Sequence, residues 1–177
     1  MDEIKLNKFE RLSLVNQFLI MKGQGEEAIN GNSYYSLEMI NAAIEILSAG
    51  HEALYADVFN AISEPTSKEI GDEVYEILSL YFDALLSFEK LPKSEQTEEL
   101  RSLIEFDGFD GNEEIEHYAT LKVIVKDLNQ FEGLFEDKKS LNSHMNRLSK
   151  YRNELAKSKE FTELYSLSAE SLYKIFK

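Results

Sequence analysis

Hydrophobic residues recur along the chain at intervals of three and four, which is the spacing of an amphipathic α-helix. The longest such run follows Pro65, where Ile70, Val74, Ile77 and Leu78 share one helical face. Alternation of the kind that a strand shows is nearly missing. The expected fold class is therefore all-α, a single-domain, bundle-like array of about seven or eight helices. The pattern predicts helices over residues 8–22, 35–49, 52–62, 67–90, 95–104, 111–129, 141–157 and 168–176.

Local signals mark several of these helix ends. Asn7 followed by Glu10, and Thr66 followed by Glu69, both fit a capping box at a helix start. Gly50 fits a left-handed stop at a helix end. The chain has no long linker rich in Pro, Gly or Ser and no internal repeat, so we expect one domain over residues 1–177.

The composition excludes several classes of chemistry. The chain has 177 residues, of which 43% are hydrophobic, and it contains no Cys. Disulfides, thiol nucleophiles and Cys-based metal sites are therefore excluded. No apolar run approaches the roughly 20 residues that a membrane span needs, so we expect no membrane association. The acidic start, Met1-Asp2-Glu3, leads into no signal-type apolar segment, which favours a cytoplasmic location.

Charge is unevenly distributed around a net charge of −14. Residues 51–106 contain 13 acidic and 4 basic residues, whereas residues 137–177 contain 5 acidic and 9 basic ones. The basic section either packs against the acidic middle of its own chain, meets the acidic section of another subunit, or binds a polyanion or an acidic partner. The overall charge argues against nucleic acid, because binding would need a candidate basic patch on an exposed face with few carboxylates nearby. That patch consists of Arg147, Lys150 and Arg152.

Two short motifs resemble metal sites but lack essential ligands. His51-Glu52 begins like a zinc-protease motif, but Tyr55 stands where the second His is required. Glu114 and His117 have the E-x-x-H spacing of a di-iron helix, but the chain has no second copy. We therefore predict no cofactor, no metal site and no catalytic residue. The cluster Asp110, Glu113, Glu114, Glu116 and His117 is kept for an alternative function, in which facing helices bind a small molecule or metal.

Six stretches of the chain resemble the bacterial YfbU family in sequence and in order. The most specific is Gly108-Phe109-Asp110-x-Asn112-x-Glu114, with Tyr118 four residues further on. The resemblance implies an all-helical, single-domain bacterial cytosolic protein with no established activity, so no catalytic residue is carried over. The six stretches are Arg11–Met21, Tyr75–Leu91, Phe106–Val125, Phe131–Phe135, Asn142–Leu155 and Ser166–Ile175.

This motif defines a candidate interaction loop. A turn is expected here, with Gly108 or Gly111 at positive φ and Asp110 as the N-cap of the following helix. Phe109, between the two glycines, is either buried as a staple or offered to a partner. The candidate residues of the loop are Phe109, Asp110, Asn112, Glu114 and Tyr118.

Three functions follow in order of preference. The first is a non-enzymatic interaction or regulatory module that forms a homo-oligomer and binds a protein partner. The second is a metal-dependent enzyme or ligand binder that uses the carboxylate cluster from Asp110 to His117. The third is a regulator linked to nucleic acid through Arg147, Lys150 and Arg152, with binding that weakens steeply as salt rises.

Overall fold

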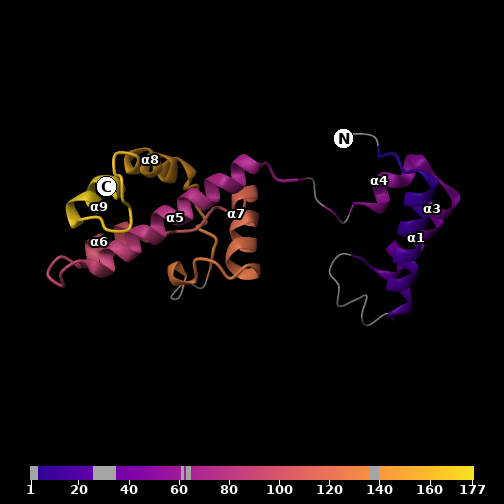
Figure 1. Cartoon of the computed structure of the whole chain (residues 1–177), viewed down its shortest axis with the longest axis horizontal. Helices are drawn as coiled ribbons and strands as arrows, with labels where there is room; N and C mark the ends of the chain where they lie inside the picture. The colour runs from indigo at the N-terminus through magenta and orange to yellow at the C-terminus, as the bar shows by residue number, and fades with distance from the viewer. Residues whose placement is uncertain (1–3, 26–34, 61, 63–64, 136–139) are drawn as a thin grey trace. The chain divides into compact units, whose positions relative to one another are not determined.

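The computed structural model describes residues 4–25, 35–60, 62, 65–135 and 140–177 (Figure 1). Its contacts separate two compact units, Met1–Pro65 and Thr66–Lys177, and each is described by itself. The described residues form helices and turns, with one isolated bridge between Phe109 and Asn142 and no strand. The all-α prediction is confirmed. The chain divides into two compact units, and the expectation of one domain over residues 1–177 stays a prediction.

The N-terminal unit is built on the pairing of α1 (Lys8–Gly23) with α3 (Leu37–Ala49). The capping box predicted at Asn7 is present: its Oδ1 accepts from the N–H of Glu10 at 3.0 Å, and Glu10 Oε2 accepts from Asn7 N–H at 2.8 Å. Gly50 ends α3 with φ 76°, as its sequence predicts. The small core of this unit consists of Phe18, Ile40, Ala43, Leu47, Tyr55 and Val58.

The helix predicted over residues 52–62 is much shorter in the structure. A 3-10 turn, η1 (Glu52–Leu54), leads into a single helical turn, α4 (Tyr55–Val58). Of the apolar residues spaced by four on which the prediction rested, Leu54 and Ile62 are exposed and only Val58 is buried. A segment with so little apolar surface to bury cannot hold a longer helix. Residue 61 of the predicted helix lies outside the described residues.

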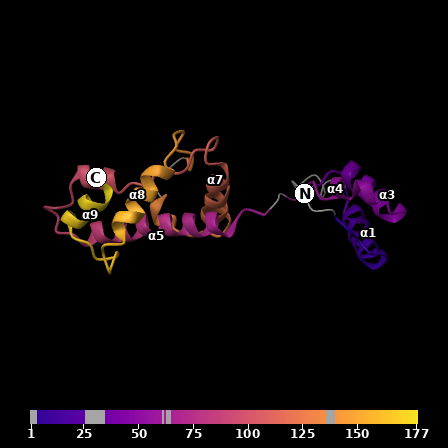
Figure 2. The ribbon, with the colours of Figure 1, turned by 90° about the horizontal axis from the view of Figure 1, so that it is seen from above.

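The C-terminal unit is organised around one long helix, α5 (Lys68–Lys90), which runs along the whole unit in Figure 2. Its N-cap is Ser67, whose Oγ accepts from Ile70 N–H at 3.4 Å, so the capping box predicted at Thr66 is wrong by one residue. The surrounding elements are α6 (Glu98–Leu103), α7 (Ile115–Lys122), the π-helical turn η2 (Val123–Asp127), the 3-10 turn η3 (Glu132–Leu134), α8 (Leu148–Ser158) and α9 (Ala169–Phe176).

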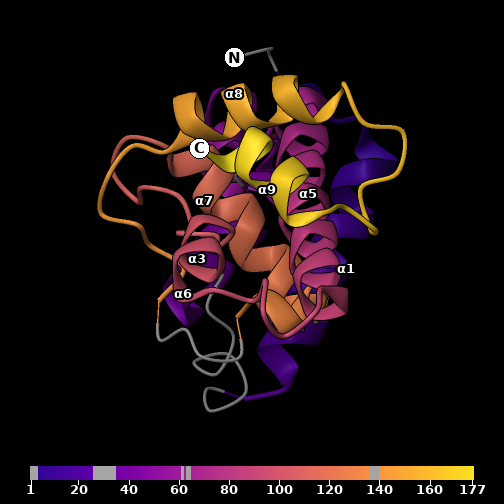
Figure 3. The same cartoon turned by 90° about the vertical axis from the view of Figure 1, so that its left-hand side faces the viewer.

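Several of these helices pack on α5 and on one another. Contacts join α5 to α7 and α8, and α9 to both α6 and α8. Figure 3 shows α8 and α9 side by side. At the centre, the ring of Tyr81 lies 5.1–5.4 Å from the rings of Phe106, Tyr151 and Phe176. This buried aromatic cluster fixes where α8 and α9 sit against α5.

Two predicted helix starts in this unit are wrong. The helix expected from residue 111 begins at Ile115, and the one expected from residue 141 begins at Leu148. At the start of α7, Ile115 is exposed whereas Glu114 and His117 are buried; further along, Leu121 and Ile124 are buried. The residues before both helices form a pair of hydrogen-bonded loops instead, and these loops contain the candidate site.

Candidate functional site

The loop at residues 107–114 lies against the segment at residues 140–148. Phe109 N–H donates to Leu141 O at 3.2 Å, and Ser143 N–H donates to Phe109 O at 3.1 Å. Gly108 adopts φ 93°, and a Cβ at this position would lie 2.1 Å from Leu141 O. Only glycine permits both this backbone conformation and this close approach. The expected positive φ is therefore found at Gly108.

Phe109 is buried, which decides between the two alternatives that its sequence left open. Its side chain has no exposed surface. Its ring centroid lies 5.6 Å from that of Phe106, 5.4 Å from His117 and 5.6 Å from Tyr151. The Tyr151 hydroxyl also donates to Gly108 O at 2.8 Å. Phe109 thus anchors the 107–114 loop to the aromatic core and is not presented to a partner.

Asp110 caps a turn rather than the start of α7. Its Oδ1 accepts from the N–H groups of Asn112 at 2.7 Å and Glu113 at 3.2 Å. Its own N–H donates to Glu114 Oε2 at 2.7 Å. The turn occupies residues 111–114, so α7 starts later than its sequence predicts.

Glu114 joins this loop to the start of α8. Its buried carboxylate accepts through Oε1 from the N–H groups of Arg147 and Leu148, both at 2.6 Å. These groups lie at the N-terminus of α8, where helices have N–H groups without an internal partner. Glu114 therefore acts as a capping residue for a helix that lies 33 residues further along the chain. The sequence offers no local cap at this start, and a remote one cannot be found from spacing.

Asn142 is a site residue that sequence reasoning missed as a contributor to the loop. Its Oδ1 accepts from Gly111 N–H at 3.2 Å and from His144 N–H at 2.8 Å. It therefore closes a local Asx turn and holds the 107–114 loop at the same time. The available signal was an Asn at the second residue of the predicted helix 141–157, because Asn favours turns over helix interiors. Of the remaining candidate residues, Asn112 is exposed, and Tyr118 is half-buried with Lys122 Nζ 5.8 Å from its ring.

A second polar group links α5, α7 and α8. Arg152 Nε and Nη2 donate to the Glu73 carboxylate at 2.7 and 2.9 Å, and His117 Nε2 lies 2.8 Å from Glu73 Oε2. The Arg152 hydrogen bonds lower the pKa of Glu73 to about 2, against the opposing effect of burial. The same contact raises the pKa of Arg152. This bidentate pair holds charge in place and has no free carboxylate edge for a ligand.

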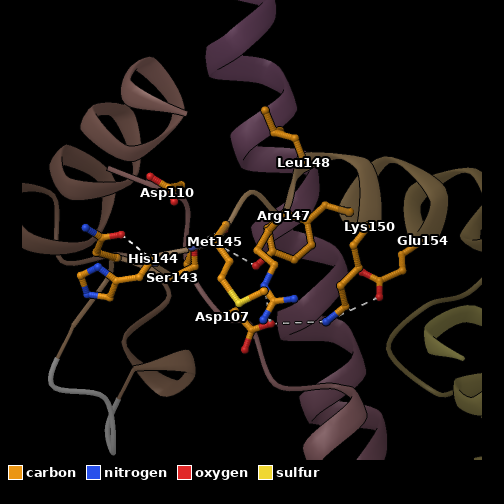
Figure 4. Close-up of polar contacts among 12 residues, drawn as sticks. Asp107, Asp110, Ser143, His144, Met145, Arg147, Leu148, Lys150 and Glu154 are labelled. Atoms are coloured by element: carbon orange, nitrogen blue, oxygen red, sulfur yellow. Dashed lines mark hydrogen bonds and ion pairs between the residues drawn. The ribbon is translucent and has the colours of Figure 1, made fainter. Parts of the chain in front are cut away.

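A third polar group contains a buried acid. The Tyr81 hydroxyl donates to Glu154 Oε2 at 2.6 Å, and Lys150 lies between Glu154 and Asp107, 3.9 and 3.5 Å from their oxygens (Figure 4). Arg147 Nε faces Asp107 Oδ2 at 3.2 Å. Burial raises the pKa of Glu154 to about 7, although Tyr81 and Lys150 oppose the shift. Burial likewise raises the pKa of Tyr81 and of Tyr151.

The structure thus pairs each residue of the candidate basic patch with a carboxylate of the C-terminal unit. Arg147 and Lys150 face Asp107, and Arg152 binds Glu73. These contacts agree with the interpretation that the basic section packs against the acidic middle of its own chain. An exposed face with few carboxylates, which nucleic-acid binding would need, is not formed by these three side chains. The prediction against nucleic acid remains untested.

The candidate carboxylates do not converge on a common point. Asp110 and Glu114 use their oxygens to bind backbone N–H groups, while Glu113 and Glu116 are exposed. His117 turns instead toward Glu73. Within the described parts of the chain, no group of three or more His, Asp or Glu side chains is arranged to hold a metal ion. The carboxylates of Asp110 and Glu114 therefore have a structural role: they hold the two loops together and cap the start of α8.

None of the helices in the described residues is both long enough and apolar enough to cross a membrane. The described residues are helical, and the Gly108–Tyr118 motif holds two loops and the start of α8 together, which places the chain among all-α proteins. The family model of the YfbU domain matches residues 4–177, and the chain belongs to this family.

A relative has nearly the same extent as this chain. UPF0304 protein MJECS11 of Methanocaldococcus jannaschii is 29% identical over 175 residues, which cover 96% of this chain and 98% of the relative. The two units described above therefore both fall within the matched length. Because this relative is archaeal, family membership by itself does not place the chain in a bacterium.

Proposed function

We propose that this protein is a non-enzymatic interaction module that self-associates through its N-terminal unit. The observation that carries the proposal is an exposed, largely apolar face of α1, which we call the exposed stripe. It consists of Phe9, Leu12, Asn16, Leu19 and Ile20.

The exposed stripe lies on the side of α1 opposite to its packing face. Leu14, Phe18 and Met21 pack with α3 in the core of the N-terminal unit. Arg11 is on the same inner side, where its Nη1 donates to Leu47 O at 3.0 Å. The apolar residues of the stripe lie outside this core, although Leu12 also borders a groove with Leu47 and Ser48 of α3. A helix with a second apolar face has surface for a further contact.

The amount of exposed apolar surface matches the need of a stable dimer. Phe9 is 79% exposed, Leu12 57%, Leu19 49% and Ile20 65%. With about 200 Å² for a whole Phe side chain and slightly less for Leu or Ile, the stripe presents roughly 450 Å². A standard interface buries about 800 Å² per partner, of which a little over half is apolar, also about 450 Å².

The core of the N-terminal unit is small, so self-association would stabilise this unit. Its buried apolar cluster has only six members among the described residues. Units of about 65 residues bury a low fraction of their surface and gain stability when a partner covers more of it. A second copy of the chain supplies such a surface. In a two-fold symmetric dimer, the exposed stripe of each copy contacts the exposed stripe of the other.

The proposal is tested by measuring the mass of the full chain in solution. Sedimentation velocity over a range of about 1 to 200 μM should show a dimer that dissociates on dilution. Leu12→Glu places a charge in the stripe and should weaken the dimer at least tenfold, because an unpaired charge is costly in an apolar interface. Far-UV circular dichroism should remain helical, since Leu12 is not part of the core.

Gln17→Glu is the matched control. Gln17 is exposed on the same helix but beside the stripe, and its substitution adds the same charge. It should leave the dimer within about twofold of the unchanged protein. A wild-type chain that stays monomeric over the whole range contradicts the proposal, as does a dimer that Leu12→Glu and Gln17→Glu weaken equally.

A further inference from the structure

We infer that α1 pairs in parallel with α1 of a second copy, and that the two Asn16 side chains meet at the two-fold axis. This inference rests on the proposed self-association and specifies its geometry. The exposed stripe carries it through three features: its spacing, its central amide and the charges beside it.

The spacing of the stripe is that of a two-stranded coiled coil. Phe9, Leu12, Asn16 and Leu19 follow at intervals of three, four and three, which are the a and d positions of two heptads. Gly23 stands at the next a position, at the end of α1, and a Cβ there would meet no other atom within 4 Å. α1 is already helical because α3 packs behind it, so pairing does not have to form the helix.

Asn16 supplies a reason for the partner to be a second copy. It is exposed at the middle of the stripe, with apolar residues on either side. A side-chain amide carries both a donor and an acceptor, so two identical amides satisfy each other across a two-fold axis. An Asn at one a position is the feature that sets register and favours two strands in parallel coiled coils.

The flanking charges distinguish parallel from antiparallel pairing. Beside the a and d positions, one edge carries Lys8, the half-buried Val15 and Lys22, and the other edge carries Ser13 and Ile20. Parallel pairing brings opposite edges together, so Lys8 lies near Ser13 and Val15 near Ile20 of the second copy. Antiparallel pairing brings like edges together and places Lys8 near Lys22 of the second copy. Like charges in register are destabilising, which favours the parallel arrangement.

Single cysteines report the arrangement directly, because the chain has none of its own. Gly23→Cys leaves every apolar residue of the stripe intact and should form a disulfide-linked dimer under mild oxidation. If α1 pairs antiparallel with Phe9 against Leu19, the two positions 23 lie about 27 Å apart, far beyond the reach of a disulfide. Gln17→Cys points beside the stripe and serves as the control that should not cross-link.

Antiparallel pairing has its own positive signal. A mixture of Phe9→Cys and Leu19→Cys chains should give a mixed disulfide in that arrangement, and this result would overturn the inference. Dimers seen by sedimentation without cross-linking of Gly23→Cys would also overturn it, while the proposed self-association would stand. Loss of the dimer itself would contradict the proposed function instead.

Asn16→Val tests the role assigned to the amide. The substitution replaces a polar group with an apolar one in the stripe, so the dimer should become tighter. It should also lose its single orientation, so cross-linking of Gly23→Cys should fall by about half or more while the mixed disulfide appears. If a chain that carries both Gly23→Cys and Asn16→Val cross-links as well as Gly23→Cys alone, Asn16 does not set the orientation.

Discussion

The two units of this protein use the same helical periodicity but bury it to different extents. In the C-terminal unit, the long helix α5 is covered by neighbours, and its core contains 18 buried apolar residues among those described. In the N-terminal unit, α1 buries Phe18 and leaves Phe9, Leu12, Leu19 and Ile20 exposed. The C-terminal unit also exposes single apolar side chains, such as Ile115 and Met145, but its central helix is enclosed by its own neighbours, whereas the first helix of the N-terminal unit keeps an apolar face exposed.

The polar groups of the two units also differ, in how far along the chain their hydrogen-bond partners lie. In the C-terminal unit, buried acids are satisfied from distant parts of the chain, as Glu114 is by the start of α8 and Glu154 by Tyr81. The side-chain hydrogen bonds of α1 are mostly local, between Asn7 and Glu10 at its start, with one from Arg11 to Leu47 O. We therefore expect substitutions in the C-terminal loops to affect stability and substitutions in the exposed stripe to affect association.

The largest effect should come from Glu114→Ala. The substitution removes the acceptor for three backbone N–H groups, those of Asp110, Arg147 and Leu148. Leaving such buried donors unpaired should lower the free energy of unfolding of the C-terminal unit by about 4 kcal/mol. Chemical denaturation followed by tyrosine fluorescence measures the change, and hydrogen exchange should show lost protection at residues 147–151.

Glu113→Ala is the matched control for this measurement. Glu113 is exposed, and its side chain accepts a long hydrogen bond of 3.5 Å from Asn146 Nδ2. Its removal should change the free energy of unfolding by less than about 0.5 kcal/mol. Equal losses in the two variants would show that Glu114 is not the cap of α8. The dimer predicted for the exposed stripe should persist in Glu114→Ala wherever the chain stays folded.

A somewhat smaller loss is expected for Gly108→Ala. The new Cβ would lie 2.1 Å from Leu141 O, and φ 93° is strained for alanine. Thermal unfolding should show a loss of about 3 kcal/mol. Gly71→Ala is its counterpart within α5, where a Cβ meets nothing within 4 Å. It should stabilise the protein by about 0.5–1 kcal/mol, and a similar loss in both variants would refute the close approach at Gly108.

The smallest of the three effects is a pH dependence from Glu154. Its pKa is 4.5 as an isolated group and about 7 in the folded chain, so the folded state binds the proton more tightly. Its contribution is therefore largest below pH 4.5 and is lost as the pH rises through 7. We expect the free energy of unfolding to fall by on the order of 2 kcal/mol between about pH 5 and about pH 8.

Two variants isolate this contribution. Glu154→Gln cannot titrate and should remove the fall. Tyr81→Phe removes a hydrogen bond that lowers the pKa of Glu154, so the fall should shift to higher pH. The range also avoids the titration of Glu73, whose pKa of about 2 makes its contribution disappear only in acid. An unchanged pH profile in Glu154→Gln would assign the dependence to another group.

Much of the fold could be predicted where the causes are local. The start of α1 follows from Asn7 and Glu10, the end of α3 from Gly50, and the extent of α5 from its apolar spacing and Pro92. Ser168 at the start of α9 accepts from Ser171 N–H at 3.2 Å, close to the predicted boundary. Each of these features depends on residues within one or two helical turns.

The predictions failed where a partner lies far away in the chain. The helix expected over 141–157 begins only at Leu148, because Leu141 and Ser143 form hydrogen bonds with Phe109 across the two loops. The carboxylates from Asp110 to Glu116 are close in sequence but differ in environment. Asp110 and Glu114 bind backbone N–H groups, whereas Glu113 and Glu116 are exposed to solvent. Spacing along a helix does not show which side chain a backbone group in another loop will reach.

The sequence by itself determined the helical class, most helix ends and the resemblance that the family match confirms. Those properties follow from periodicity, caps and motif order, which act over a few residues or can be compared residue by residue. The tertiary structure decided that Phe109 is buried, that Glu114 caps α8, that the basic residues are paired and that α1 keeps an apolar face exposed. Burial and hydrogen bonding depend on atoms brought together by folding, and their positions in space are not contained in local sequence patterns.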